Sequence, residues 1–167
     1  MASPRILIAG IGNIFLGDDA FGVEVAQRLV GRAWPEGVSV VDYGIRGFDL
    51  AYAMMADIDI TILVDAAPRG EPPGTLFVLE PDLAELNAAP EMEIETHAMN
   101  PVAVLRLVSA LGGQPRRVLV VGCEPASFGP EQGQMGLSEP VQAAVAEAVT
   151  MVAALVERLR AETPVAA

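Results

Sequence analysis

Residues 6–19 consist of ILIAGIGNIFLGDD, an apolar run that passes through a glycine-rich turn into two adjacent carboxylates. The apolar run, Ile6 to Ala9, is typical of a strand buried on both faces. The apolar periodicity that follows predicts a helix from Asp19 to Arg32. A glycine turn with an acid pair, placed where a first strand passes into a first helix, indicates a functional site.

Other segments continue this alternation of strand and helix. Three more apolar runs predict buried strands: Val38 to Val41, Ile58 to Val64 and Val118 to Val121. Three more segments have helical periodicity: Gly47 to Met55, Met99 to Leu111 and Glu139 to Arg160. Thr75 to Glu80 follows Pro-Pro-Gly, which predicts a short antiparallel edge strand. The expected fold is a three-layer α/β/α sandwich with a mostly parallel, twisted sheet of about five strands.

The last helix has the clearest pattern. Ser138 is its expected N-cap and Pro140 lies in its first turn. Eight apolar residues share one stripe and should face the core: Val141, Ala144, Val145, Ala148, Val152, Leu155, Val156 and Leu159. The acidic, irregular segment Pro81 to Thr96 is expected to be a surface loop.

Composition limits the class of protein. The chain has 167 residues, of which 52% are hydrophobic, so residues 1–167 are expected to form one domain. A net charge of -12 argues against nucleic acid or an anionic membrane as partner. One cysteine and the absence of a leader pattern in Met1 to Arg5 favour the cytoplasm. No apolar stretch is expected to reach the roughly 20 residues of a membrane span, because charged residues, Gly or Pro interrupt each one.

Polar residues at the carboxyl ends of the strands are the candidate site, because ligands of open α/β sheets bind there. Asp18 and Asp19 follow the first strand, Asp65 ends the 58–64 run, and His97 is the only histidine. Two carboxylates and an imidazole suit a divalent transition metal such as nickel or zinc better than calcium.

Each of these residues also has a plain structural interpretation. Neighbouring helical residues point about 100° apart, so Asp18 is the expected helix cap and Asp19 the expected ligand. Both acids could instead serve only as a cap and a first-turn residue of the helix, and Asp65 could be a turn residue before Pro68. His97 could be a satisfied structural histidine.

Two other chemistries fit the sequence less well. Gly10 and Gly12 begin a dinucleotide-binding pattern, but Phe15 occupies the place of its third glycine, and the acid pair would repel a pyrophosphate. Cys123 could be a nucleophile with His97 as its base, or simply a small buried residue at a strand end. The sequence lacks H-E-x-x-H, P-loop and G-x-S-x-G motifs.

Several motifs, taken in order, resemble those of the nickel-iron hydrogenase maturation proteases. Residues 10–19 match the family's G-x-G-N-x-x-x-x-D-[DE] after a first strand. Asp42 to Gly47 is similar to its D-G-G-T-x-G segment, Val64 to Ala66 to its strand-end D-A, and Thr96-His97 to its S/T-x-H region. Val121 to Pro125 and Gly136 to Ser138 are similar to its V-G-x-x-P and G-L-[ST]. The resemblance spans nearly the whole chain.

The resemblance implies an endopeptidase of the aspartyl type. It would remove the C-terminal peptide from the precursor of a nickel-iron hydrogenase large subunit after nickel insertion. The family's metal-contacting residues map to Asp19, Asp65 and His97, the same set that the strand ends indicate, and they would also be the catalytic residues. The nickel is expected to be carried by the precursor and used for recognition. Either a carboxylate or the nickel could activate the attacking water.

The chain departs from the family pattern in two places. Tyr43 and Ile45-Arg46 replace the smaller D-G-G-T residues, so contacts with the partner in that loop are expected to differ. The opening motif ends with Asp19, which is one methylene shorter than the Glu of other members. The competing interpretation is a metal-sensing chaperone that binds the same precursor without cutting it.

Overall fold

The computed structural model describes residues 3–84 and 99–162. Their strands form one five-stranded sheet in the order β2-β1-β3-β5-β4. The strands are β1 (Ile6–Ile11), β2 (Val38–Gly44), β3 (Ile60–Ala66), β4 (Leu76–Leu79) and β5 (Arg117–Cys123). The first three and β5 are parallel, and β4 pairs antiparallel with β5. The predicted mostly parallel sheet with one antiparallel edge strand is confirmed.

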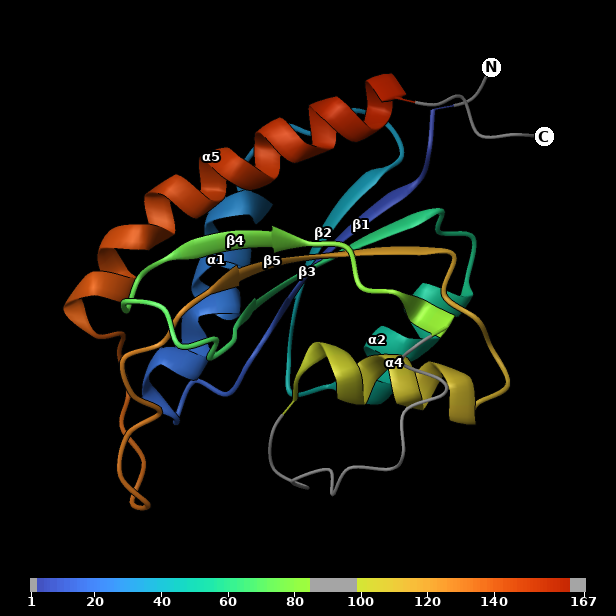
Figure 1. The fold of residues 1–167 in the computed structure, drawn as a ribbon. Coiled ribbons are helices and arrows are strands. Elements are labelled where there is room, and N and C mark those ends of the chain that lie inside the picture. The colour runs from blue at the N-terminus through green and yellow to red at the C-terminus, as the bar shows by residue number, and fades with distance from the viewer. Residues whose placement is uncertain (1–2, 85–98, 163–167) are drawn as a thin grey trace.

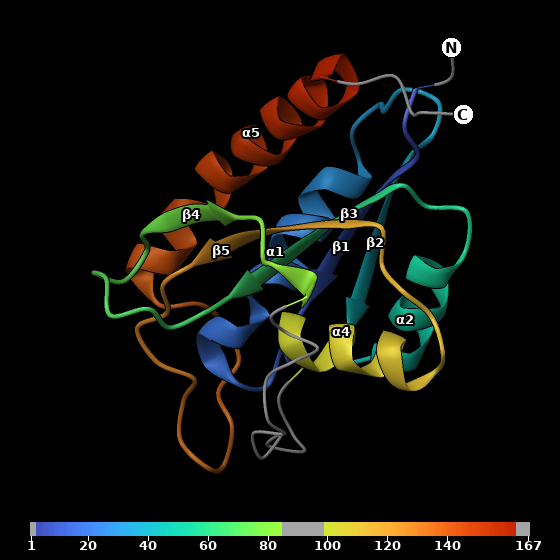
Figure 2. The same cartoon turned by 45° about the vertical axis from the view of Figure 1, so that its right-hand side comes forward.

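Helices cover both faces of the sheet (Figures 1 and 2). Their bounds are α1 (Phe21–Val30), α2 (Gly47–Met55), α4 (Pro101–Ala110) and α5 (Glu139–Glu162). Ile6 and Ile8 of β1 belong to the core shared with α1 and α5, whereas Leu7 and Ala9 belong to the core shared with α2 and α4. This alternation explains why the strand is apolar at every position: both of its faces are buried.

The parallel strands extend further than the apolar runs predicted. β1 continues to Ile11, β2 to Gly44, β3 to Ala66 and β5 to Cys123. Polar or glycine residues interrupt the apolar pattern at these ends, yet the backbone pairing continues, as between Asp65 and Gly122. The prediction placed Asp65 after its strand, but it lies within β3.

The first helix begins later than predicted. Gly17–Ala20 forms a short 3-10 helix, and α1 starts only at Phe21. Gly22, in the first turn of α1, lies against the sheet: a Cβ there would meet the carbonyl oxygens of Val64 at 2.1 Å and Ile11 at 2.4 Å. This close approach fixes the start of α1 over the carboxyl ends of β1 and β3.

The long helix α5 buries all eight residues of the predicted stripe. By length and composition alone, it is also apolar enough to cross a membrane, which corrects the expectation that no segment is. Its apolar stripe, however, packs against the sheet in the same core as α1. This is the burial of a core helix in a globular domain.

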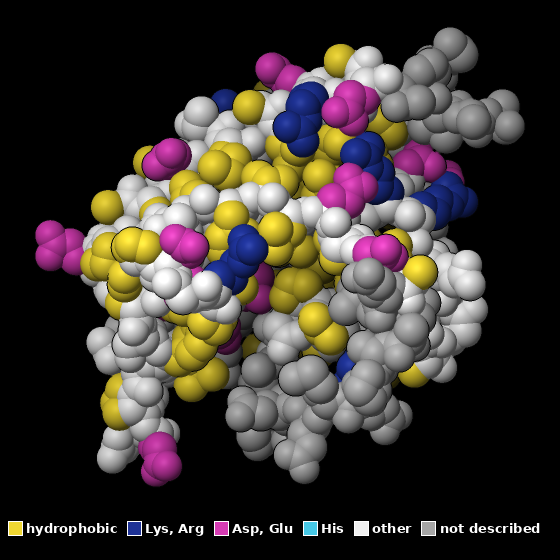
Figure 3. All heavy atoms as spheres, viewed as in Figure 1, with side chains coloured by type: hydrophobic (Ala, Val, Ile, Leu, Met, Phe, Trp, Pro, Cys, Tyr) yellow, Lys and Arg dark blue, Asp and Glu magenta, His cyan; other side chains and the backbone are white. Residues whose placement is uncertain are grey.

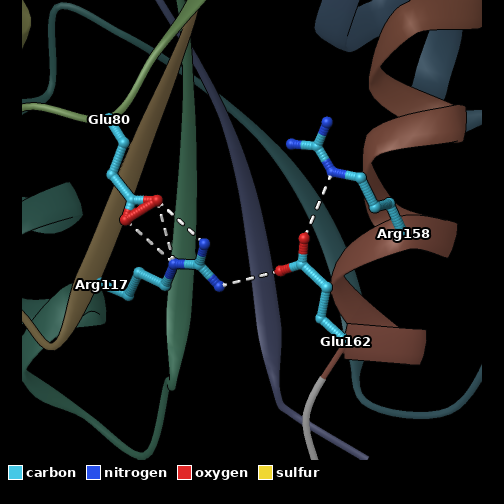
Figure 4. A network of polar contacts seen from close by, with 4 residues as sticks. All are labelled: Glu80, Arg117, Arg158 and Glu162. Atoms are coloured by element: carbon cyan, nitrogen blue, oxygen red, sulfur yellow. Dashed lines mark hydrogen bonds and ion pairs between the residues drawn. The ribbon is translucent and has the colours of Figure 1, made fainter.

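A small ion-pair network joins α5 to the sheet at the edge opposite the candidate site (Figure 4). Arg117, at the start of β5, pairs with Glu80 at 2.9 Å and with Glu162 at 3.4 Å, and Arg158 also contacts Glu162. All four side chains are more than a third exposed. Such pairs each contribute at most about 1 kcal/mol, so the network adds little to stability.

Candidate functional site

The carboxyl edge of the parallel strands brings several acids together. Asp19 lies in the 3-10 helix after β1, and Asp65 is the second-last residue of β3. Both side chains are buried, with exposed fractions of 7% and 1%. The 3-10 helix contacts β3, so two residues 46 positions apart in the chain become neighbours. The predicted meeting of strand-end carboxylates is thus realised for this pair.

The glycine-rich turn allows Asp19 to fold back toward the sheet. Gly12 has φ +145, and a Cβ there would lie 1.8 Å from the backbone carbonyl of Asp19. Any side chain at this position would push the acid pair away from β1. The next residue, Asn13, donates its backbone N–H to Asp19 Oδ2 at 2.8 Å, which fixes the orientation of the carboxylate.

Burial dominates the electrostatics of Asp19. Removal from water raises the pKa of Asp19 above its ordinary value, and the hydrogen bond from Asn13 lowers it only in part. No positively charged side chain among the described residues forms an ion pair with Asp19. The carboxylate is therefore available to a cation that comes from outside the described part of the chain.

Asp65 lies in the least favourable environment for a negative charge. Its Oδ1 is buried and has no hydrogen-bond partner among residues 3–84 and 99–162. Burial raises the pKa of Asp65 well above its ordinary value, the charge of Asp19 raises it further, and the Ala66 N–H opposes both. A buried acceptor without a donor costs about 1–3 kcal/mol. An acid kept at such a cost is a strong candidate for a functional group.

The two carboxylates together suit a divalent cation. The two like charges repel each other, and this repulsion contributes to the raised pKa of Asp65. A divalent cation would offset that repulsion and could be coordinated by the Asp65 oxygen that lacks a partner among the described residues. Carboxylate oxygens alone suit many metals, and an added imidazole would favour a transition metal. The predicted imidazole, His97, lies outside the described residues.

Asp18 does not cap its helix, which corrects the prediction. Its carboxylate is fully buried and accepts hydrogen bonds from the loop between β5 and α5. The donors are the N–H groups of Ala126 and Ser127 and both the N–H and the hydroxyl of Ser138, at 2.7 to 3.1 Å. Burial raises the pKa of Asp18, but these hydrogen bonds outweigh it, so the pKa lies below its ordinary value.

Asp18 therefore joins the glycine turn to the start of α5. The helix begins at Glu139, directly after the predicted cap residue Ser138, whose hydroxyl donates to Asp18. Sequence patterns could not identify these partners, because they lie 108 to 120 residues away along the chain.

Glu124 is a further buried acid, and the sequence analysis did not select it. It follows β5, is 6% exposed, and accepts hydrogen bonds from the N–H groups of Arg69 at 2.6 Å and Gly70 at 3.2 Å. These bonds hold the loop that follows Asp65 and β3. The signal was present, since a carboxylate directly after a buried strand was the reason for selecting Asp65.

The end of β2 and the loop after it contain the residues that differ from the motif pattern. Arg46 donates to the backbone carbonyls of Asp42 and Tyr43, and its guanidinium lies 5.5 Å from the Tyr43 ring centre. The Tyr43 side chain is buried, whereas Ile45 is 60% exposed. Tyr43 and Arg46 thus stabilise the loop itself, and Ile45 projects outward.

Cys123 is a structural residue in the described geometry. It is fully buried at the end of β5. Burial, together with the charges of Asp18 and Glu124, raises the pKa of Cys123 to about 11. A thiol in this environment is a poor nucleophile at neutral pH.

We expect the Cys123→Ala variant to keep the peptidase activity that the sequence motifs imply within about twofold of wild type, because a thiol in this environment takes no part in the reaction. The native protein should also fail to react with a thiol reagent at pH 8 until it is unfolded. Activity is measured by peptide release, and thiol exposure by absorbance with and without denaturant. Loss of activity in a folded variant would restore the cysteine mechanism.

Comparison with known proteins gives a consistent result. A family model described as hydrogenase maturation protease (HycI) matches residues 23–155, more than half of the chain. A hydrogenase expression/formation protein (HupM) of Azotobacter chroococcum is 36% identical over 98% of this chain and 77% of its own length. The hydrogenase 2 maturation protease of Escherichia coli is 33% identical, covering 90% of this chain and 89% of its own length.

Solved structures agree with the sequence matches. The hydrogenase maturating endopeptidase HybD of Escherichia coli superposes with a TM-score of 0.71 at 30% identity, over 92% of this chain and 93% of that chain. The solution structure of an endopeptidase from Escherichia coli gives a TM-score of 0.73 at 32% identity, over 92% of each chain. The fold is thus shared across nearly the full length of this chain and of both solved structures.

Proposed function

The chain belongs to the hydrogenase maturation protease family, and we propose that it removes the C-terminal extension of a nickel-iron hydrogenase large-subunit precursor after nickel insertion. The observation that supports the site assignment is the buried pair of Asp19 and Asp65, with one Asp65 oxygen unpartnered within the described part of the chain. The two residues are the proposed catalytic and metal-contacting carboxylates. His97 completes the proposed set on the basis of its sequence motif.

The nickel ion is proposed to belong to the precursor. A resident ion is not needed to explain the fold, because the opening turn is held by Asn13 and Asp18. The paired carboxylates provide negative charge and a free oxygen for an ion presented by another protein. Contact with that ion would place the C-terminal segment of the precursor at the carboxyl edge of the sheet. Nickel would thereby report that the precursor is ready to be cut.

Incubation of the purified protein with nickel-loaded precursor tests this function. We expect the precursor to lose the mass of a C-terminal peptide and to gain one water at the cut, as measured by intact-protein mass spectrometry. A stable complex of two uncut chains would instead identify a non-proteolytic chaperone. The same assay run with other cellular proteins measures selectivity.

The raised pKa values of Asp19 and Asp65 predict the pH dependence. Divalent metals bind ionised carboxylates, and this pair ionises fully only at a pH well above the ordinary carboxyl value of about 4. We therefore expect kcat/KM for the nickel-loaded precursor to fall as the pH is lowered, with a midpoint clearly above 4.

Circular dichroism and the nickel content of the precursor are followed over the same pH range, so that unfolding and metal loss are distinguished from titration of the site. If activity instead falls with a midpoint near pH 4 while the fold and the nickel are intact, the pKa values of Asp19 and Asp65 are not raised in the active protein.

The cytoplasm remains our proposed location. The single, buried cysteine is compatible with a reducing compartment.

A further inference from the structure

Four large apolar side chains are exposed on two loops beside the site. Ile14 and Phe15, in the turn after β1, are 40% and 58% exposed, and Phe128 and Met135, in the loop between β5 and α5, are 39% and 68% exposed. We call these four residues the apolar ridge. Single exposed apolar residues are common, but a group on adjacent loops marks a surface for interaction.

The two loops that carry the ridge are joined by their backbones. Gln134 donates its N–H to the carbonyl of Phe15 at 2.8 Å, and Gly17 donates to the carbonyl of Gln134 at 2.8 Å. Asp18 adds a bond from its own N–H to the carbonyl of Ser127, besides the contacts of its carboxylate. These hydrogen bonds hold the backbone of both loops in place. Binding of a partner to the exposed side chains would therefore cost little loop conformational entropy.

The ridge is continuous with the carboxylate pair. Asn13, whose N–H holds Asp19, directly precedes Ile14. In Figures 1 and 2 the loop between β5 and α5 projects from the body at the end toward which the parallel strands run. The space-filling view shows this loop as a protrusion, with apolar side chains around its base (Figure 3). A protein that reaches Asp19 would therefore meet the ridge.

The charge of the ridge segments differs from that of the whole chain. The protein carries a net charge of -12, but residues 13–17 and 127–136 contain one charged side chain, Glu131. The complementary surface is therefore apolar rather than strongly basic. A permanent second copy of the chain on the ridge would cover the approach to Asp19. The arrangement thus favours a transient partner, the substrate itself.

We infer that the apolar ridge docks an apolar surface of the large-subunit precursor beside its C-terminal segment. This inference rests on the proposed function. Buried aromatic and methionine side chains at the centre of an interface contribute most of the affinity, so Phe15 and Met135 are the expected main contacts. The ridge would set affinity for the folded precursor, while the carboxylate pair recognises the metal.

The test compares Phe15→Ala, Met135→Ala and their double variant with Val30→Ala. Val30 is a matched control, because it is 56% exposed but lies at the far end of α1. Binding is measured with the nickel-loaded precursor immobilised on a sensor surface, which gives Kd. Cleavage rates are measured at precursor concentrations up to saturation, which gives KM and kcat. The three substituted side chains are exposed, so the melting temperatures of all variants should match that of wild type.

For the double variant we expect the precursor Kd and KM to rise about tenfold or more, with kcat nearly unchanged. Val30→Ala should behave as wild type. If the double variant binds and cuts the precursor as the wild type does, the inference about the ridge is wrong and the proposed function is unaffected. Failure of the wild type to bind and cut the precursor would overturn the proposed function and the ridge together. A dimer seen by sedimentation, and lost in the double variant, would assign the ridge to a second copy and so refute the inference.

Discussion

The Asp65→Asn and Asp19→Asn variants are expected to lose cleavage of the nickel-loaded precursor by about a thousandfold or more. Each substitution keeps the shape of the side chain but removes the negative charge that the proposed site presents to the metal. The initial rate of peptide release, measured by mass spectrometry, gives the magnitude. A rate within tenfold of wild type would remove that residue from the site.

Asp59→Asn is the matched control for Asp65→Asn. Asp59 directly precedes β3, whereas Asp65 lies near the opposite end of the same strand. The Asp59 carboxylate accepts hydrogen bonds from Arg5 and Arg116, at the end of β3 away from the carboxyl edge of the sheet. Its variant should lose some stability but cut at the wild-type rate. A similar loss of activity in both variants would indicate a general effect of acid removal.

Stability should separate the functional role of Asp65 from a structural one. Its raised folded pKa means that ionisation costs stability as pH rises through the window from the unfolded pKa to the folded pKa. The free energy of unfolding of Asp65→Asn should therefore exceed that of wild type by the most at pH values above this window. The difference should disappear at low pH. Urea unfolding at several pH values measures the difference. A variant that is inactive yet equally or more stable at neutral pH identifies Asp65 as a functional acid.

Asp18→Ala is expected to destabilise the fold by about 4 kcal/mol. The substitution removes an ionised acceptor and leaves the N–H groups of Ala126, Ser127 and Ser138 without their partner. Activity should fall as well, because the turn that positions Asp19 loses its link to the loop before α5. Urea denaturation and the cleavage assay measure the two effects.

Asp57→Ala provides the comparison for this loss. The Asp57 side chain is 75% exposed and pairs only with the exposed Arg5 among the described contacts. Its removal should change stability by less than about 0.5 kcal/mol. Because the pKa of Asp18 is lowered, its contribution is present above the unfolded pKa and is lost as pH falls through the folded pKa. An equal effect of both variants, or no dependence on pH, would contradict the role assigned to Asp18.

Short-range patterns were sufficient for most of the fold. Each predicted strand and helix exists, because an apolar run or stripe directly reflects burial on one or both faces. The Pro-Pro-Gly turn also predicted the antiparallel β4. Errors concentrated at the carboxyl ends of strands and at the start of α1, where polar and glycine residues form the site instead of the core.

The role of Asp18 shows what the sequence could not provide. Local rules favour a cap for an acid before a helix, but its actual donors include Ala126 and Ser138 in a distant loop. The proximity of Asp19 and Asp65 was predictable because parallel strands end at one edge, whereas the loops between strands carry no such rule. Glu124 directly follows a strand and so carried the same sequence signal as Asp65, but its partners Arg69 and Gly70 are defined only by the folded loop.

The central claim is that the nickel of the precursor, recognised by Asp19 and Asp65, permits the cut. The most direct measurement is the intact mass of the same precursor, prepared with and without nickel, after incubation with the wild-type protein. We predict loss of the C-terminal peptide from the nickel-loaded form and an unchanged mass for the nickel-free form. Equal cleavage of both forms, or of neither, would contradict the claim.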